Sequence, residues 1–383
     1  MRRLLPFVAA VVGVDSLLYA ALSPLLPHFT HELGLSKARA GALVAAYDGG
    51  ALVGALPGGL AAARFGPRRA VLVGLSLMGA AGLAFAFAGE FWTLLGARFL
   101  QGCGSAFTWS GALAWLLAVA PRERRGELLG NALGAAVFGI LFGPVVGAAA
   151  ALIGRGPVFS AVAALAVVLG AWALRIAPAP AQRTSTESVG RAFRNRRFVA
   201  GLALMTLPAL LFGALSVLAP LHLADAGWGA AAIAAVFLFG AALEMVEAPL
   251  VGRLIDRRGR LLPVRIALAV GVLLSLGLAA GARPLVYVPL IIVASLAYSL
   301  LFTPAFALIA DGAEEAELPQ GMAFGFMNVA WASGAMVGPA AAGAIAAATS
   351  DTVPFVLAAV LCAVTLVASR PATARRAERM ARA

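Results

Sequence analysis

Long apolar stretches alternate with short polar segments along almost the whole chain. A helix needs about 20 apolar residues to cross the hydrocarbon core of a bilayer, and these stretches reach or approach that length. They are continuous, whereas the strands of a membrane barrel alternate apolar and polar residues. The pattern predicts twelve transmembrane helices, at residues 5–27, 38–63, 70–89, 92–119, 128–152, 157–176, 200–222, 230–252, 263–281, 285–311, 320–348 and 353–369.

Composition supports an all-α membrane protein. The chain is 62% hydrophobic and 12% charged, whereas a soluble domain has about 45–50% apolar and about 25% charged residues. The first stretch begins with Arg2 and Arg3 and so imitates a signal peptide. It is too long for one, however, and it contains Asp15, so we expect it to be the first transmembrane helix.

Basic residues are distributed unevenly between the two sides of this topology. Twenty-four of the 29 fall in segments on the same side as the N-terminus, and cytoplasmic loops are enriched in Lys and Arg. We therefore expect a multi-pass protein of the cytoplasmic (inner) membrane with both termini in the cytoplasm. The net charge of +12 could also suit nucleic acid, but the arginines flank the membrane, so no nucleic-acid partner is expected.

The chain contains an internal repeat. "GLAAARFGPRR" (Gly59–Arg69) and "VGRLIDRRGR" (Val251–Arg260) share glycines and arginines, and "GILFGPVVG" resembles "GAMVGPAAAG" about 195 positions later. A constant offset at separate places indicates duplication. We expect two pseudo-symmetric six-helix bundles at residues 1–176 and 200–369, joined by a cytoplasmic linker at 177–199 and followed by a basic tail at 370–383.

Four groups of residues match known transporter motifs. The first loop motif comprises Gly59, Arg64, Gly66, Arg68 and Arg69, and its second copy comprises Gly252, Asp256, Arg257, Gly259 and Arg260. The helix-4 motif comprises Arg98, Gln101 and Gly102. The helix-5 motif comprises Gly130, Gly139, Gly143, Pro144 and Gly147, and its helix-11 counterpart comprises Gly325, Gly334, Gly338 and Pro339.

Through these motifs the chain resembles the major facilitator superfamily from end to end. The helix-5 motif, together with Asp15 ahead of Pro24 and Pro27, resembles the twelve-span drug/proton antiporter branch. The resemblance implies alternating access, in which two halves rock around a central site. It also implies a proton gradient as the energy source, no cofactor and a monomer.

The loop motifs are predicted to hold the cytoplasmic gate closed; plain membrane anchoring by arginine is the alternative. In the family, the acid at the position of Asp256 bonds into the opposite half and stabilises the outward-facing state. The first copy has Ala63 in place of that acid, so we expect a looser equilibrium that favours the inward-facing state. Small residues in helix 5 predict a close approach to helix 8.

Five ionisable residues within the predicted helices are candidates for proton coupling: Asp15, Asp48, Arg98, Glu244 and Glu247. Such residues are costly in a membrane and commonly mark a pathway. Burial favours the protonated form of a carboxyl group, as a proton carrier requires. Glu247 is expected to pair with Arg253 or the loop arginines. The family gives Arg98 a coupling role.

The candidates for substrate contact are Trp109, Asn131, Asn328 and Trp331; packing is the alternative for each. Aromatic rings can hold flat or cationic ligands. Amine transporters of the similar branch carry acids where this chain has Ser299 and Asn328, so a strongly cationic amine is not implied.

The expected function is proton-coupled efflux of small hydrophobic or drug-like molecules. An uptake symporter or facilitator of a small metabolite is one alternative, and a non-transporting sensor or scaffold is another. No metal-ligand spacing, nucleophile constellation or phosphate loop occurs, so an enzyme is not expected. Cys103 and Cys362 both lie in apolar stretches and indicate no disulfide framework.

Overall fold

The computed structural model is helical throughout the residues it describes, which are 3–21, 37–181, 185–228, 230–281 and 283–369. A chain inside lipid must satisfy its backbone hydrogen bonds within each segment, and continuous apolar segments do so as helices. Within this part of the chain, nine helices are long and apolar enough to cross a membrane, and α1 and α15 are shorter apolar helices. The count of twelve spans stays a prediction.

The helices fall close to the predicted ranges. The first group is α1 (Leu4–Ala20), α3 (Lys37–Phe65), α4 (Pro67–Phe87), α5 (Phe91–Val119), α6 (Arg125–Ile153) and α7 (Arg155–Leu174), with a short 3-10 turn at Arg122–Arg124 before α6. The second group is α9 (Arg196–Asp225), α10 (Ala230–Arg258), α11 (Leu261–Ala279), α12 (Pro284–Ser299), α13 (Phe302–Glu315), α14 (Gln320–Ala348) and α15 (Thr352–Ala368). Pro24, Pro27 and the tail at 370–383 lie outside the described residues.

One predicted span is interrupted. The stretch 285–311 forms two helices, α12 and α13, that meet at Leu300 and Leu301. Pro304 has no backbone N–H, so the carbonyl of Leu300 lacks its partner four residues later. Helix α13 is therefore separate from α12, and α13 packs against α6, α9 and α14.

The linker contains a helix that was not predicted. Helix α8 (Thr186–Arg194) begins with a capping box in which Ser185 and Ser188 exchange hydrogen bonds. Phe193 packs edge-on against Phe198 of α9 and Phe326 of α14. The linker is therefore tied to the second group of helices. The predicted boundaries at 176, 199 and 369 remain predictions.

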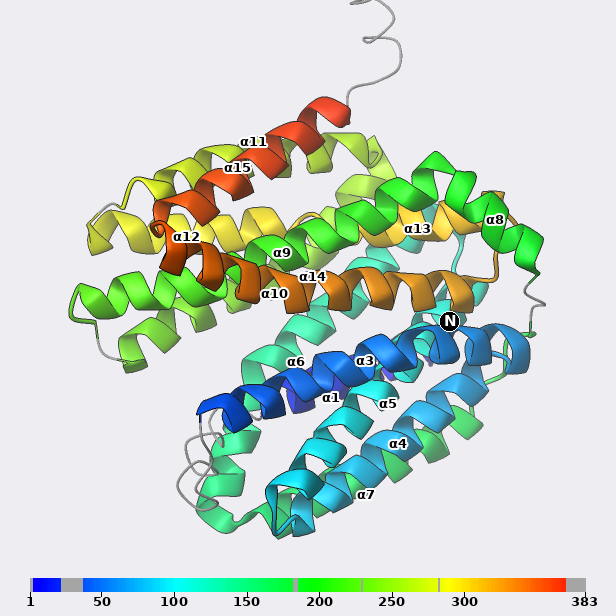
Figure 1. Ribbon diagram of the computed structural model, residues 1–383. Coiled ribbons are helices and arrows are strands. Elements are labelled where there is room, and N and C mark those ends of the chain that lie inside the picture. The colour runs from blue at the N-terminus through cyan, green and yellow to red at the C-terminus, as the bar shows by residue number, and fades with distance from the viewer. Residues whose placement is uncertain (1–2, 22–36, 182–184, 229, 282, 370–383) are drawn as a thin grey trace, which may run out of the picture.

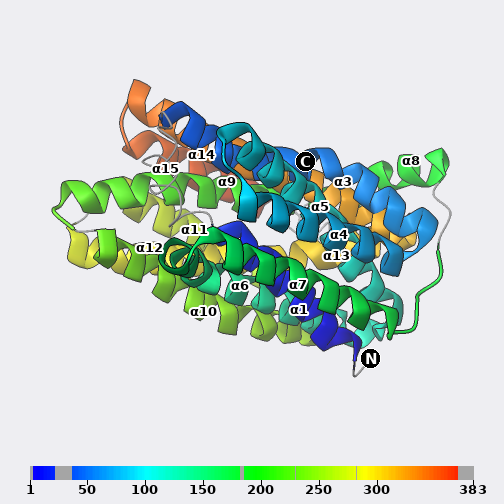
Figure 2. The ribbon, with the colours of Figure 1, turned by 90° about the horizontal axis from the view of Figure 1, so that it is seen from below.

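The two groups of helices converge at one end of the molecule and diverge toward the other (Figure 1). The convergent end carries α8 and the turns 65–67, 120–125 and 258–261, and we name it the basic end. The opposite end is named the far end. Figure 2 shows the long helices running between these ends, with α8 projecting at the basic end. Across the groups, α6 packs against α10 and α3 packs against α14.

Glycines permit both of these crossings. A methyl group added to Gly130 of α6 would lie 2.4 Å from the Ala248 oxygen of α10, and one added to Gly325 of α14 would lie 2.8 Å from the Ala55 oxygen of α3. Both distances are far shorter than a carbon–oxygen contact allows, so only glycine fits. The two crossings are equivalent under the internal repeat.

The later glycines of the helix-5 motif do not approach helix 8 (α10), although the motif as a whole was expected to do so. Gly139 and Gly143 face α1, where an added methyl group would lie 2.1 Å from the Gly13 oxygen and 2.7 Å from the Leu17 oxygen. Gly334 and Gly338 of α14 face α9 in the same way. Only the start of the motif lies against α10, because α6 diverges from α10 toward the far end and packs within its own group.

Candidate transport cavity

A cavity of about 510 Å³ lies between the two groups of helices. Ligand pockets commonly have volumes of about 300–1,000 Å³, so this space suits a small organic molecule. Its lining comes from α1, α3, α5 and α6 on one side and from α9, α10, α12, α13 and α14 on the other. Most of the lining is apolar, and among the described residues its only charged side chains are Asp15 and Glu244.

Asp15 projects from α1 and is only 1% exposed. One carboxylate oxygen, Oδ2, accepts hydrogen bonds from the Ser105 hydroxyl at 2.6 Å and from the Trp109 indole N–H at 2.8 Å. The Tyr47 hydroxyl donates to Ser105 at 2.7 Å and extends this chain. The other oxygen, Oδ1, is buried without a hydrogen-bond partner. It is therefore free to take a proton or to accept a hydrogen bond from a ligand.

Arg98, of the helix-4 motif, holds the end of α1. Its guanidinium donates to the Leu18 oxygen at 3.1 Å and to the Tyr19 oxygen at 2.7 Å, and it also donates to Gln101 at 2.9 Å. These carbonyls belong to the last turn of α1, where backbone oxygens lack partners and the helix dipole is negative. The guanidinium also lies over the rings of Tyr19 and Tyr47. No acid is its direct ion-pair partner among the described residues, so its predicted coupling role stays a prediction.

The other predicted acids differ in their positions. Glu244 of α10 lines the cavity, and so does Ser295 of α12, whose hydroxyl donates to the Ile292 oxygen. Asp48 and Glu247 do not line the cavity, and each has one buried oxygen without a partner.

The expected pairing of Glu247 with Arg253 is not found. Arg253 pairs instead with Glu127 of α6, at 3.5 Å. Arg253 lies six positions after Glu247, which places the two side chains on different sides of α10 at about 100° per residue.

Three of the four candidates for substrate contact line the cavity: Trp109, Asn328 and Trp331. Asn131 does not. The residues of α6 that face the cavity are Leu133, Ala136, Val137 and Ile140, and Asn131 lies two residues before this face, about 200° around the helix. Sequence reasoning also missed Tyr47 and Ser105; the proximity of Ser105 to the helix-4 motif was the available signal.

Several residues that line the cavity also join the two groups of helices. The Asn328 amide of α14 donates to the Ala106 oxygen at 3.2 Å and to the Ser110 hydroxyl at 3.1 Å, both on α5. Tyr19 meets Trp331 edge-on, and Trp109 stacks on Phe306. Each pair joins a residue of the first group to one of the second.

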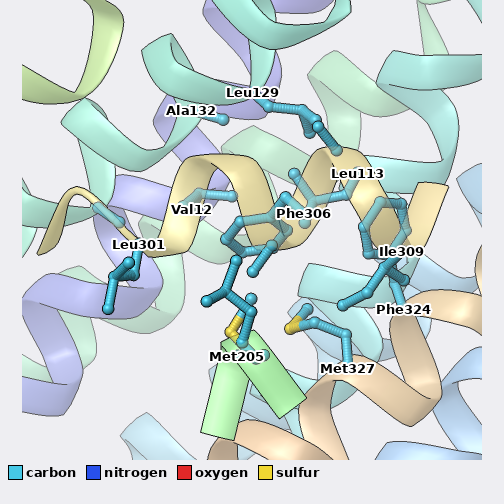
Figure 3. Packing of buried hydrophobic residues seen from close by; sticks show 14 of the residues in the cluster. Val12, Leu113, Leu129, Ala132, Met205, Leu301, Phe306, Ile309, Phe324 and Met327 are labelled. Carbon is cyan, nitrogen blue, oxygen red and sulfur yellow. The ribbon is translucent and has the colours of Figure 1, made fainter. Parts of the chain in front are cut away.

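An apolar cluster surrounds Phe306 of α13 (Figure 3). Phe306 is 3% exposed. The first group contributes Val12, Leu113, Leu129 and Ala132, and the second contributes Met205, Ile309, Phe324 and Met327. We name these nine residues the gate cluster. Because they come from both groups, their packing closes the basic end.

Asp256 of the second loop motif fastens the surface of the basic end. Its two carboxylate oxygens accept hydrogen bonds from the backbone N–H groups of Gly126 and Glu127, at 3.0 and 2.8 Å. These N–H groups begin α6 and have no partner within the helix, and the dipole there favours a negative charge. Asp256 thus caps a helix of the opposite group, as the family resemblance implied.

A second set of ion pairs also crosses between the groups. Arg122 of the 3-10 turn and Arg125 at the start of α6 both bind Glu314 of α13, and the Arg125 pair is 2.6 Å long. Within the second group, Arg260 pairs with Asp311, and Arg257 is exposed. The acidic end of α13 therefore receives arginines from several segments.

Among the described residues, the first loop motif makes no equivalent charged contact between the groups. Arg68 donates to the Ile176 oxygen just after α7, whereas Arg64 and Arg69 are exposed. In place of the missing acid, Ala63 is 2% exposed and packs closely on α14, where a methyl group added to Gly321 would lie 2.8 Å from the Ala63 nitrogen. The structure is closed at this end; the expected looser equilibrium stays a prediction.

Comparison with known proteins now decides the family. The sequence model of the Major Facilitator Superfamily matches residues 8–320. The chain belongs to the Major Facilitator Superfamily. It is therefore a multi-pass membrane transporter rather than an enzyme, and its helices form the major facilitator fold.

Two curated relatives cover most of this superfamily member. The "Chloramphenicol resistance protein" of Streptomyces lividans is 28% identical over 366 residues, which is 91% of each chain. The "Uncharacterized MFS-type transporter YcaD" of Salmonella enteritidis is 24% identical over 349 residues, covering 90% of this chain and 89% of that protein.

Among solved structures, the human organic anion transporter MFSD10 (TETRAN) aligns with a TM-score of 0.82 at 16% identity, over 96% of this chain and 99% of that one. That similarity confirms the fold alone. No group of three or more His, Cys, Asp or Glu that could hold a metal ion occurs within the described residues.

Proposed function

We propose that this transporter exports small hydrophobic molecules in exchange for protons. The observation that carries the proposal is Asp15, a buried carboxylate on the wall of a largely apolar cavity with one oxygen bound and the other without a partner. If one carboxylate binds either a proton or a donor group of the ligand, the proton and the ligand compete for that carboxylate. Such competition is what antiport requires.

The remainder of the cavity supports a flat or positively charged hydrophobic substrate. The rings of Tyr19, Trp109 and Trp331 lie in its wall, and aromatic faces attract cations and flat apolar groups. Glu244, across the cavity from the first group, is the second candidate for proton binding. The relative named for chloramphenicol resistance supports efflux, because resistance to an antibiotic is consistent with its removal from the cell.

We further propose that the basic end faces the cytoplasm, because cytoplasmic loops are enriched in arginine. The structure then represents an outward-facing state, with the cavity closed to the cytoplasm by the gate cluster. The protein is proposed to act as a monomer in the cytoplasmic membrane.

The first prediction concerns transport itself. Purified protein in proteoliposomes that enclose a pH-sensitive dye is given a pH gradient and then a panel of lipophilic cations and neutral drugs. We expect some compounds to trigger proton movement, because substrate displaces the proton from its carboxylate. Asp15→Asn is expected to abolish that movement, and Glu244→Gln shows whether the second acid is also required.

The matched control is Glu90→Gln, which makes the same change at an exposed residue and is expected to leave proton movement intact. Compounds that cross the membrane without moving protons in every variant would show a facilitator and contradict the proposal. Loss of movement in Glu244→Gln but not in Asp15→Asn would assign the proton to α10 instead.

A further inference from the structure

Trp109 contacts both the buried acid Asp15 and the gate residue Phe306. Its indole N–H binds the Asp15 carboxylate at 2.8 Å, and its ring stacks on Phe306 with centroids 6.3 Å apart and planes 14° from parallel. Asp15 belongs to α1 of the first group, and Phe306 belongs to α13 of the second. One side chain therefore connects the buried acid with the opposite half of the transporter.

The contact between Trp109 and Phe306 extends to the gate cluster. Phe306 lies at the centre of the gate cluster, whose members come from both halves (Figure 3). Its ring also packs on Phe324 of α14, with centroids 6.2 Å apart. Close-packed interiors respond to displacements of a fraction of an ångström, so a shift of the Trp109 ring changes the surface on which Phe306 is packed.

The bond between Trp109 and Asp15 depends on the charge of the carboxylate. An indole N–H is a donor only, and hydrogen bonds to an ionised acceptor are roughly twice as strong as neutral ones. Protonation of Asp15 therefore weakens the contact that fixes the indole. A ligand that binds Asp15 would compete for the same oxygens.

Few other charged groups face Asp15. Arg98 on α5 is bound to the end of α1, and Tyr19 lies one turn further along α1 itself. The Tyr47 hydroxyl of α3 lies 3.3 Å from Asp15 Oδ2 and 2.7 Å from the Ser105 hydroxyl. Asp48 follows Tyr47 on α3. The residues of α6 and α7 that pack on α1 include Ala135, Gly139, Gly143 and Trp172, none of which is ionisable. Glu244 faces the cavity from α10.

We propose that Trp109 is the positioning residue that couples the charge of Asp15 to the gate, by holding Phe306 stacked while the carboxylate is ionised. Ionised Asp15 keeps the indole fixed and the basic end closed. Protonated Asp15 releases the indole, the stack on Phe306 loosens, and the basic end opens. A proton taken up from outside would thereby drive opening toward the cytoplasm; this inference rests on the proposed proton-coupled antiport.

The test measures gate opening directly and needs no substrate. Spin labels at Glu123→Cys and Arg258→Cys, both exposed and one in each half, report the distance across the basic end in proteoliposomes. The background carries Cys103→Ala and Cys362→Ala. The ratio of open to closed populations is measured by pulsed electron resonance at a series of pH values.

We expect the background protein to open as the pH falls. Trp109→Phe keeps an aromatic ring but removes the N–H, and it is expected to reduce the change in that ratio about fivefold. Phe306→Leu keeps the apolar volume but removes the stack, with the same expected result. Asp15→Asn should show no response.

Trp115→Phe is the matched control. It removes an indole N–H bond on the same helix, from Trp115 to the oxygen of Ala177 at the start of the linker, and should leave the pH response unchanged.

The outcomes separate the two proposals. A background protein whose gate does not respond to pH would contradict the coupling at Asp15, and the inference would fall with it. If the background responds and Trp109→Phe and Phe306→Leu respond equally, proton coupling stands and the role of Trp109 is overturned. A pH response that persists in Asp15→Asn would also overturn the inference, since another acid would then drive the gate.

Discussion

Asp15 and Asp256 are the same residue type, but their different hydrogen-bond partners suit them to different roles. Both oxygens of Asp256 bind backbone N–H groups at the start of α6, so this carboxylate is fully engaged in joining the two halves. Asp15 has one oxygen without a partner, and it lines the cavity. Asp256 is therefore suited to hold a conformation, and Asp15 to bind what is transported.

The second prediction concerns Asp256→Asn. The neutral amide can accept from only one of the two N–H groups and loses its favourable interaction with the helix dipole, which is worth about 1 kcal/mol. We expect the open population at the basic end to rise about fivefold.

The measurement is the rate at which a thiol reagent added at the basic end labels a cysteine placed at Met327, inside the gate cluster. Asp225→Asn, an exposed aspartate at the far end, is the control. An unchanged labelling rate in Asp256→Asn would show that this cap does not hold the gate.

At the scale of elements, α6 has two different packing partners along its length. Its first turns lie on α10 of the other half, through Gly126 and Gly130, whereas Gly139 and Gly143 lie on α1 of its own half. In the proposed rocking of the two halves, the first contact would separate and the second would be kept in every state. One sequence motif thus serves both a moving seam and a fixed one.

The third prediction compares Gly130→Ala with Gly139→Ala. Overpacking costs about 1–3 kcal/mol. At Gly130 that cost falls only on the state closed at the basic end, so we expect a shift toward opening with a small change in melting temperature. At Gly139 the cost falls on every folded state, so we expect a lower melting temperature and an unchanged distribution of states.

Spin-label distances and thermal unfolding together check this contrast. Gly96→Ala is the control, since an added methyl group there has no neighbour within 4 Å. Equal conformational shifts in both test variants would contradict the division of α6 into a moving and a fixed seam.

At the scale of the whole molecule, the two halves are fastened at the basic end by unequal means. The α6–α10 crossing has the Asp256 cap, and the pairs of Arg122 and Arg125 with Glu314 of the neighbouring α13 lie beside it. The α3–α14 crossing relies on close packing of Ala63 and Gly321. Charge therefore concentrates on one of two crossings that the internal repeat makes equivalent.

The fourth prediction follows for Arg125→Glu and Glu314→Arg. Either single change places like charges at the closed seam, so each is expected to favour opening of the basic end. The double variant restores an opposite pair and should recover most of the closed population. Spin-label distances at low salt check this, because salt screens exposed pairs. Failure of the double variant to recover closure would show that Glu314 does not fasten the halves.

The fifth prediction concerns orientation. A cysteine at Asp351, exposed at the far end, should react with a membrane-impermeant maleimide on intact cells, whereas one at Glu123, exposed at the basic end, should react only after permeabilisation. This follows from the arginine content of the basic end. The reverse pattern would place the cavity on the cytoplasmic side and turn the proposed outward-facing state into an inward-facing one.

The sequence by itself determined the approximate positions of the long helices, that the chain is duplicated, and which segments carry the basic charge. In a membrane, a continuous apolar run has one stable backbone form, so local composition is sufficient for these features. It also placed Asp15 and the loop motifs, because an acid in an apolar run or a charge group between two runs is visible without a structure.

Only the tertiary structure decided which faces meet. Asn131 does not line the cavity, and Gly139 packs against α1 instead of α10. A helix turns about 100° per residue, so an error of one or two positions moves a side chain to another face. Arg98 capped α1, and Trp109 joined Asp15 to Phe306, through contacts between residues 79 to 197 positions apart. Such pairings depend on helix tilt and rotation, which side-chain packing sets and which no single segment encodes.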